Sequence, residues 1–442
     1  MVTHERISVR LRQCRMMNAD LVGLPPGLPA GAVVDLDALR DNVALLNERA
    51  GAAGVMAVLK ADGYGHGALP CARAALAGGA TWLGVAQLSE ALALRAGGIE
   101  APVLSWLNVP GDRFVQAVAA RIDIGVSADW ALTEVAAAAE TAGVAARVHL
   151  KIDTGLNRNG AAAANWPDLV DAALKLQATG LIQVVGVFSH LAWADDPVHP
   201  TTAAQTVNFV TAIELAERRG ARFEVRHLAN SASTLTNPDT HFDLVRPGLA
   251  VYGLSPVPDV STATELGLRP VMTLLGRIAH VKPVPAGEGI SYGHTYVTSR
   301  ETTVAVVPLG YGDGLPRHAG NRGPIQVGRR WYRVAGRVSM DQIVIDLGNP
   351  ADQPRSVDIA DVTAGDTAVL FGGAPGQPTA QDWADAADTI SYEIVTRIGA
   401  RVPRIYVGRV GTAGISPATG EVAVAAIASM TRAATGTARF DG

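Results

Sequence analysis

Charge, cysteine and long apolar runs are all scarce in this chain of 442 residues. Charged residues make up 18% and the formal net charge is −4, which gives no basic footprint for nucleic acid. The two cysteines, Cys14 and Cys71, lack metal-like spacing, so we expect no metal site and a reducing compartment. No segment approaches the roughly 18 consecutive apolar residues of a membrane span, and residues 1–20 lack the apolar middle of a secretory signal. We therefore expect a cytoplasmic protein with no nucleic-acid or membrane partner.

The chain is long, and hydrophobic residues make up 48% of it. Domains typically run from roughly 50 to 250 residues, so this length predicts two of them. We expect an N-terminal extension over residues 1–30, a first domain over 31–268 and a second over 269–410. Residues 411–442 form a tail to which the sequence assigns no structure.

Short β-branched runs alternate with Ala- and Leu-rich helical stretches from Val33 to about Gly253, which is typical of βα units on a parallel sheet. Nine runs qualify as strands, whereas a (β/α)8 barrel needs eight. We exclude "VVDLD" at Val33, because Lys60 then ends the first barrel strand and "RPG" ends the eighth. A doubly wound sheet is the alternative, but "KADGYGHG" does not match the glycine fingerprint that normally follows its first strand. The pattern favours an α/β fold with an N-terminal TIM-type barrel.

After Arg269 the helical stretches largely stop, and short strand-like runs follow one another with glycine turns. This pattern predicts a C-terminal, mostly β domain. One helical piece, "TAQDWADAADTISYEIVTRIG", interrupts it before "RVPRIYVG".

Polar side chains collect where the predicted barrel strands end. A barrel carries its chemistry at the carboxyl ends of its strands. The residues at those ends are Lys60, Lys151 with Asp153, His190, Asn230 with Ser231, and Arg246. Any one of them is more simply read as a polar strand cap, but together they predict an active-site rim.

The last two strands end in "ANSA" and "RPGLA", which offer a hydroxyl and free backbone N–H groups where barrels commonly bind phosphate. A lysine amine forms a Schiff base with an aldehyde, and pyridoxal phosphate carries both an aldehyde and a phosphate. Burial at the end of the apolar run "VMAVLK" lowers the pKa of a lysine and exposes its nucleophilic free amine. Lys60 is therefore a candidate for a cofactor lysine.

From about Val33 to Tyr406 the sequence resembles the alanine racemase family, of the bacterial type that uses pyridoxal phosphate. The cofactor-lysine motif of that family is similar to "AVLKADGYGHG", and its arginine loop to "KIDTGLNRNG". Four further segments match in the same order: "HLANSAS", "VRPGLAVYG", "SYGHTY" and "GRVSMDQ". The family fold, a (β/α)8 barrel followed by a β domain, agrees with the strand pattern.

The resemblance implies that Lys60 holds pyridoxal phosphate through a Schiff base. It implies that His190 lies against the pyridine ring and that Arg246 hydrogen-bonds the pyridine nitrogen, with His227 behind Arg246. The implied phosphate ligands are Tyr64, Ser231 beside Asn230, the backbone of Gly248 and Leu249, and Tyr392. An arginine stays protonated and donates without readily giving up its proton. The cofactor is then a weaker electron sink, which favours racemisation over transamination.

Inverting a stereocentre requires one base on each face of the substrate. The resemblance implies that Lys60 takes the proton from the D isomer and that Tyr292 takes it from the L isomer. It assigns the substrate carboxylate to Arg158 and to the backbone N–H of Met340. The remaining implied roles are a positioning lysine that many members carry carbamylated, Lys151, and two residues that narrow the entrance, Tyr311 and Tyr392.

In the family the second tyrosine comes from the partner subunit, so we expect a head-to-tail homodimer with shared active sites. The expected function is interconversion of L- and D-alanine, which supplies D-alanine for peptidoglycan. Three alternatives stay open: an amino-acid racemase of broader specificity, a non-catalytic pyridoxal-phosphate carrier and an amino-acid decarboxylase. The carrier lacks a β domain and a second base, and the decarboxylase is expected to present a glutamate at the ring nitrogen instead of Arg246.

Overall fold

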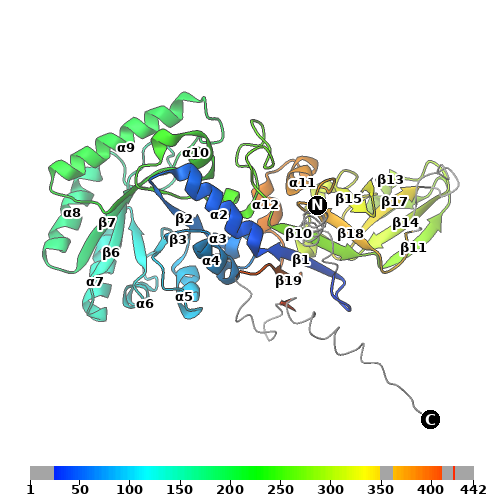
Figure 1. Cartoon of the computed structure of the whole chain (residues 1–442), viewed down its shortest axis with the longest axis horizontal. Helices are drawn as coiled ribbons and strands as arrows, with labels where there is room; N and C mark the ends of the chain where they lie inside the picture. Colours follow the sequence, from blue (N-terminus) through cyan, green and yellow to red (C-terminus); the bar gives the residue numbers. More distant parts are fainter. Residues whose placement is uncertain (1–23, 349–361, 411–421, 424–442) are drawn as a thin grey trace, which may run out of the picture. The chain divides into compact units, whose positions relative to one another are not determined.

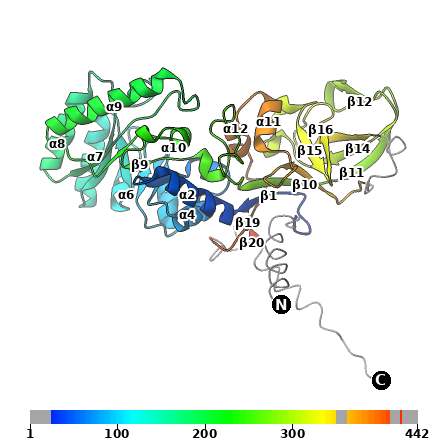
Figure 2. The same ribbon diagram turned by 45° about the horizontal axis from the view of Figure 1, so that its top comes forward.

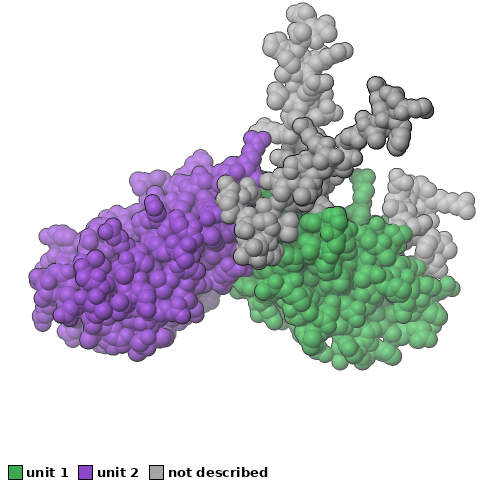
Figure 3. Space-filling view, turned by 90° about the horizontal axis from the view of Figure 1, so that it is seen from below, with its two compact units in different colours: residues 1–35, 271–407, 414–442 green, residues 36–270, 408–413 purple. Residues whose placement is uncertain are grey.

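The computed structural model describes residues 24–348, 362–410 and 422–423 (Figure 1). The predicted N-terminal extension and C-terminal tail therefore lie almost entirely outside the described residues. The chain forms two compact units, coloured separately in Figure 3. Of the described residues, one unit contains 36–270 and 408–410, and the other contains 24–35, 271–348, 362–407 and 422–423.

The first unit, called the barrel unit below, is an eight-stranded parallel sheet in the order β8-β7-β6-β5-β4-β3-β2-β9. Its strands are β2 (Gly54–Val58), β3 (Trp82–Val85), β4 (Val103–Ser105), β5 (Asp123–Val126), β6 (Ala146–Lys151), β7 (Ile182–Phe188), β8 (Val225–His227) and β9 (Leu244–Val245). Backbone bonds from Asp243 N to the Arg226 carbonyl (3.0 Å) and from Arg246 N to the Ala229 carbonyl (2.9 Å) join the last two strands. The predicted TIM-type barrel is confirmed.

Helices connect these strands: Figure 1 shows α7, α8 and α9 outside β6 and β7, and Figure 2 shows the same helices after a turn of 45°. The helices are α2 (Leu36–Ala50), α3 (Lys60–Tyr64), α4 (Ala68–Ala77), α5 (Leu88–Ala96), α6 (Phe114–Ala119), α7 (Asp129–Ala142), α8 (Trp166–Ala178), α9 (Pro200–Arg218) and α10 (Ser231–Thr236), with 3-10 turns η1 (Pro238–Thr240) and η2 (Leu249–Tyr252). Most residues of the barrel strands are buried, since helices cover one face and side chains fill the interior.

The second unit, called the β unit below, has a seven-stranded sheet in the order β16-β15-β18-β10-β1-β19-β20 and a three-stranded sheet β11-β14-β17. Its strands are β1 (Ala30–Asp35), β10 (Met272–Arg277), β11 (His280–Val284), β12 (Gly289–Ile290), β13 (Tyr296–Val297), β14 (Thr302–Val307), β15 (Pro324–Val327), β16 (Arg330–Arg333), β17 (Ile343–Gly348), β18 (Thr367–Phe371), β19 (Arg404–Val407) and β20 (Val422–Ala423). It also contains α11 (Ala380–Ala387), α12 (Ser391–Thr396) and the 3-10 turns η3 (Tyr292–His294), η4 (Tyr311–Asp313) and η5 (Arg317–Ala319).

The first three residues of the run "VVDLD" lie in β1, which pairs with β10 and β19 and takes no part in the barrel, and the last two begin α2. Its exclusion from the barrel is therefore confirmed, as are the mostly β second unit and its helical piece. Within residues 24–348 and 362–410, no helix has the length and apolarity that a membrane span requires.

Candidate active site

Lys60 lies two residues after the carboxyl end of β2 and begins α3, at the rim where a barrel carries its chemistry. Its pKa is lowered from the ordinary value of 10.5, first by burial and then by the nearby Arg158 guanidinium. Glu90 acts in the opposite direction. The Nζ atom lies 5.9 Å from the centre of the Tyr64 ring. Lys60 therefore has a larger fraction of free amine near neutral pH than a solvated lysine.

The backbone after Lys60 turns with a left-handed twist. Ala61, Asp62, Gly63 and Tyr64 all have φ between +53° and +60°. Three of the four are not glycine, and each such residue costs roughly 1–2 kcal/mol in this conformation. Glycine alone thus does not explain the turn, although the glycines of "KADGYGHG" are the visible signal in the sequence.

Two carboxylates hold this turn in place. Glu90 Oε1 accepts a hydrogen bond from Ala61 N at 2.6 Å, and Asp62 Oδ1 accepts one from Ala68 N at 2.8 Å. The other oxygen of Glu90 accepts from Ala86 N and Gln87 N at the start of α5. Glu90 therefore fixes the residue after Lys60 to the neighbouring βα loop.

Ser231, Gly248 and Tyr64 meet at the ends of the last two strands. Ser231 Oγ accepts hydrogen bonds from Gly248 N at 2.7 Å and Ala250 N at 3.3 Å. A Cβ atom added to Gly248 would lie 2.1 Å from the Tyr64 hydroxyl oxygen, so only glycine fits there. Leu249 is fully buried at the start of η2. These residues form a small cradle of hydroxyl and backbone N–H groups, which suits a phosphate.

Asn230 lies beside this cradle and caps α10. Its side-chain oxygen accepts a hydrogen bond from Ser233 N at 3.1 Å. Because the cap sets the start of the helix, Asn230 fixes the backbone that presents Ser231.

Arg246 is buried at the end of β9 and is held by several acceptors. One terminal nitrogen lies 3.1 Å from His227 Nδ1, and the other donates to the carbonyls of Ser189 at 2.7 Å and Leu228 at 3.1 Å. That second nitrogen also lies 3.4 Å from His190 Nδ1. Burial lowers the pKa of Arg246 to about 9, so it is still a cation at neutral pH.

The two histidines beside Arg246 are neutral, because burial and the adjacent cation hold both of their pKa values well below 6.5. His227 also stacks on Phe188, with ring centres 4.9 Å apart and an angle of 2° between the planes. Phe188 further lies 5.6 Å below the Arg246 guanidinium and 5.3 Å from Lys151 Nζ. Phe188, the last residue of β7, therefore makes cation–π contacts with both Arg246 and Lys151.

Lys151, Arg158, Lys60 and Arg246 concentrate positive charge on the rim. Burial and the other three cations lower the pKa of Lys151 to about 8, against a weaker opposing effect of Asp153. Asp153 Oδ1 accepts three backbone N–H groups of residues 155–157 and so shapes the loop that carries Arg158. The rim is electrostatically suited to an anionic ligand.

The other predicted residues lie in the β unit, where three of their segments come together. Tyr311 N donates to the Ser339 carbonyl at 3.0 Å, next to Met340, and Ser291 Oγ donates to the Arg337 carbonyl at 2.7 Å, next to Tyr292. Tyr292, Tyr311 and Met340 are 70%, 42% and 54% exposed. Tyr392 lies half-buried in α12 of the same unit.

Asp313 and Arg401 hold this group of loops together. Asp313 is buried, accepts from Gly310 N at 2.8 Å and binds Arg401 through both carboxylate oxygens at 2.7 and 3.0 Å. Arg401 also donates to Asp341 at 2.7 Å. The ion pairs thus join the loop of Tyr311 to that of Met340. Arg401 therefore has a structural role in the β unit.

Comparisons with known proteins follow the same division of the chain. The family model for the N-terminal domain of alanine racemase matches residues 34–256, and that for the C-terminal domain matches residues 271–406. Alanine racemase of Beutenbergia cavernae is 60% identical over 381 residues, which cover 86% of this chain and 98% of that relative. Alanine racemase of Frankia casuarinae is 57% identical over 394 residues, covering 88% and 100%. This chain belongs to the alanine racemase family.

Solved alanine racemases have the same fold. The enzyme of Streptomyces coelicolor A3(2) is 56% identical, with a TM-score of 0.83 over 87% of this chain and 99% of that one. The enzyme of the D-cycloserine producer Streptomyces lavendulae is 54% identical, with a TM-score of 0.83 over 88% and 98%. The family resemblance of the motifs is thereby confirmed, and the chain is an isomerase of the alanine racemase family.

Several residues that shape the rim or the barrel interior beneath it escaped sequence reasoning. Glu90 carried a weak signal, because it lies three residues after Gln87 at a helix start, which is capping-box spacing. Asp123 and His149 were visible as polar residues inside runs that otherwise read as buried strands. Phe188 carried no signal, since an aromatic residue at a strand end is ordinary core.

Proposed function

We propose that this chain interconverts L- and D-alanine, with pyridoxal phosphate bound at the barrel rim, and that it thereby supplies D-alanine for peptidoglycan. The support is the family membership together with a rim that combines a low-pKa lysine, a cradle of hydroxyl and backbone N–H groups and concentrated positive charge. The observation that carries the proposal is Lys60, a half-buried amine among cations at a strand end.

The residues of the rim fit the cofactor. Lys60 would bind its aldehyde carbon, and Arg246 would donate to the pyridine nitrogen with His190 against the ring. The phosphate would lie in the cradle, whose members are Tyr64, Ser231, Gly248 and Leu249, and Tyr392 is the further proposed phosphate ligand. A Cβ atom at position 248 would collide with the Tyr64 hydroxyl, so the glycine lets Tyr64 lie against the backbone of the cradle.

When bound, pyridoxal phosphate joins the amine of an amino acid and withdraws electrons from its Cα. Arg246 donates a hydrogen bond but keeps its protons, because arginine does not deprotonate readily at neutral pH. Electron withdrawal therefore stays moderate, and the substrate Cα must regain a proton quickly. This property of Arg246 favours racemisation over transamination.

Two bases on opposite faces would exchange the proton at Cα. Lys60 would remove it from D-alanine and Tyr292 from L-alanine, and each would return it in the reverse direction. A phenol has a pKa near 10, so Tyr292 needs neighbouring donors or cations before it can act as a base. Each positioned proton transfer contributes roughly 10²- to 10⁴-fold in rate.

Arg158 and the backbone N–H of Met340 would bind the substrate carboxylate, and Lys151 would position Arg158. Tyr292, Tyr311 and Met340 present exposed side chains on the β unit, as expected for groups that complete a site of a second subunit. We therefore propose a homodimer with shared sites, in which Tyr311 and Tyr392 narrow the entrance. The cytoplasmic location stays a prediction.

The test is a substrate scan with the full chain loaded with pyridoxal phosphate. Alanine, serine and larger amino acids are incubated as single isomers, and both isomers are quantified by chiral chromatography. Racemisation confined to alanine supports the proposal, and equal rates with larger side chains favour the broader racemase. Release of carbon dioxide indicates the decarboxylase, and bound cofactor without any product indicates the carrier.

Lys60→Ala provides the decisive variant. It is expected to abolish racemisation and the visible absorbance of the cofactor–lysine bond. Lys175→Ala is the matched control, because Lys175 is an exposed lysine of α8 in the same unit. Equal absorbance in wild type and Lys60→Ala would contradict the assignment of Lys60.

A further inference from the structure

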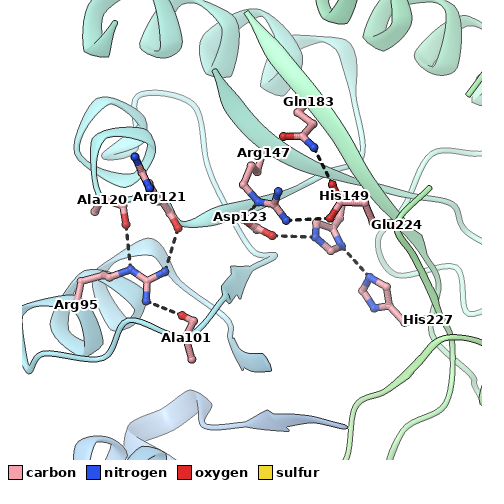
Figure 4. Close-up of polar contacts among 10 residues, drawn as sticks. All are labelled: Arg95, Ala101, Ala120, Arg121, Asp123, Arg147, His149, Gln183, Glu224 and His227. Atoms are coloured by element: carbon pink, nitrogen blue, oxygen red, sulfur yellow. Dashed lines mark hydrogen bonds and ion pairs between the residues drawn. The ribbon is translucent and has the colours of Figure 1, made fainter. Parts of the chain in front are cut away.

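A chain of buried polar side chains runs through the barrel interior and ends at Arg246. Figure 4 shows Asp123, His149 and His227 in sequence, from β5, β6 and β8. Asp123 Oδ2 lies 3.2 Å from His149 Nε2, and His149 Nδ1 lies 2.9 Å from His227 Nε2. His227 Nδ1 then lies 3.1 Å from Arg246. Asp123, His149 and His227 are each at most 1% exposed.

This series of hydrogen-bonded side chains connects the two ends of the barrel. Asp123 is the first residue of β5, at the amino end of the strands, whereas Arg246 follows β9 at the carboxyl end. At the amino end, Arg147 Nε donates to Asp123 Oδ1 at 2.9 Å and orients the carboxylate. Figure 4 shows Arg147 also facing Glu224, at 3.4 Å on the exposed side.

The position of each ring proton of His149 and His227 follows from the two groups at the ends of this hydrogen-bonded series, Arg246 and Asp123. A guanidinium has no acceptor to offer, so His227 Nδ1 must be the acceptor and carries no hydrogen. The proton of neutral His227 is then on Nε2, which donates to His149 Nδ1. His149 Nδ1 is therefore bare, and its proton lies on Nε2. That Nε2–H donates to Asp123 Oδ2, which is an acceptor when ionised.

No other protonation state satisfies all three contacts. Moving the proton of either histidine to Nδ1 places two donors, or two acceptors, face to face in the barrel interior. Protonating His149 at both nitrogens turns Nδ1 into a donor toward His227, whose own proton must then face Arg246. A buried donor without an acceptor costs about 1–3 kcal/mol, so one arrangement dominates.

We propose that Asp123 and His149 are positioning residues that hold His227 in the Nε2–H tautomer, and so keep its Nδ1 as an acceptor for Arg246. This inference rests on the proposed function for the role of Arg246, but the tautomers themselves do not. The carbonyls of Ser189 and Leu228 fix one guanidinium nitrogen of Arg246, and the chain from Asp123 fixes the other. Together they aim a donor with a defined direction at the rim.

The first test uses the full chain without cofactor, labelled with ¹⁵N in its histidines. Two-bond proton–nitrogen correlations at pH 7 report which ring nitrogen carries the hydrogen. His149 and His227 are both expected as Nε2–H tautomers. Either residue as the Nδ1–H tautomer, or as an imidazolium, overturns the inference without reference to catalysis.

The second test compares variants of His149. His149→Phe keeps a ring of similar size but removes the acceptor of His227 Nε2–H, so His227 is expected to populate both tautomers. His149→Asn leaves an oxygen near the former Nδ1 position and is expected to restore the single tautomer. This pair keeps the test informative where one variant folds poorly.

Loaded with pyridoxal phosphate, His149→Phe is expected to lose about 10-fold or more in kcat for alanine, with KM changed by less than about threefold, a loss typical of groups that orient a liganding residue. Glu224→Gln is the matched control, because Glu224 is an exposed partner of Arg147 and Gln183 that makes no contact with the two histidines. Unchanged kcat in His149→Phe overturns the inference. A wild type with the expected tautomers but no racemase activity contradicts the proposed function and leaves the tautomer assignment standing.

Discussion

Replacing Lys151 by methionine is expected to stabilise the cofactor-free protein at neutral pH. Lys151 is 7% exposed, and its ammonium group lies among Arg246, Arg158 and Lys60 with only Asp153 as an acidic neighbour. Burial and these cations lower its pKa from 10.5 to about 8. That fall corresponds to roughly 3 kcal/mol of unfavourable free energy for the ionised form, at about 1.4 kcal/mol per tenfold change in proton affinity.

One favourable contact is lost with the charge. The Lys151 ammonium lies 5.3 Å from the Phe188 ring, and such a contact contributes about 1 kcal/mol. The relief of charge burial is larger, so Lys151→Met is expected to raise the free energy of unfolding by about 2 kcal/mol at pH 7. Lys175→Met is the control, since Lys175 is exposed, and it is expected to change stability by less than about 1 kcal/mol.

The stability gained by Lys151→Met over wild type must decrease as the pH rises. The folded-state pKa of Lys151 lies below its unfolded value, so the unfolded chain binds more protons between about pH 8 and pH 10.5. Wild-type stability therefore rises through that window, while Lys151→Met lacks this contribution. The advantage of the variant is expected to be full below pH 8 and to approach zero near pH 10.

The assay is urea unfolding of the full chain at pH 7 and pH 10, in buffer freed of carbon dioxide and followed by tryptophan fluorescence. The difference between variant and wild type at each pH removes effects common to both. A variant less stable than wild type at pH 7 would refute the reasoning. So would a gain of equal size at both pH values, because it could not come from a titrating amine.

Three further predictions concern the rim and the second base. Bicarbonate is expected to convert Lys151 to a carbamate, because its lowered pKa supplies free amine and a negative group suits the surrounding cations; ¹³C NMR of the intact wild type and Lys151→Met in ¹³C-labelled bicarbonate checks this, and a wild type without a carbamate resonance would contradict it. Tyr292→Phe is expected to slow solvent deuterium exchange from L-alanine more than from D-alanine, and equal losses from both isomers would remove the two-base assignment. Glu90→Gln is expected to cost about 1.5–3 kcal/mol in stability and to speed hydrogen exchange at the amide of Ala61, with Glu214→Gln as the exposed control; unchanged exchange would show that the carboxylate does not hold the turn.

The sequence predicted the barrel well because its evidence is local and repeated. A short β-branched run followed by a helix that ends at glycine indicates each βα unit. Because a barrel carries its chemistry at the strand ends, the same pattern identifies Lys60, Ser231 and Arg246 as site residues. The split at "VVDLD" followed from counting strands, and β1 indeed pairs with β10 and β19.

Contacts between distant segments were beyond the sequence. Glu90 and Ala61 are 29 residues apart, and His149 and His227 are 78 apart, so no periodicity connects them. The left-handed turn escaped because Ala61 and Asp62 do not favour that conformation, and only the tertiary contacts of their neighbours stabilise it. The ion pairs of Asp313 were hidden for the same reason.

The central claim, that Lys60 and a second base exchange the Cα proton of alanine, is tested most directly in deuterium oxide. The full chain loaded with pyridoxal phosphate is given L-alanine, the two isomers are separated, and the deuterium content of each is measured by mass spectrometry. The account predicts D-alanine that carries one deuterium at Cα, and no D-alanine from Lys60→Ala. Alanine that stays in the L form, or D-alanine that retains the original hydrogen at Cα from the earliest time points onward, would contradict it.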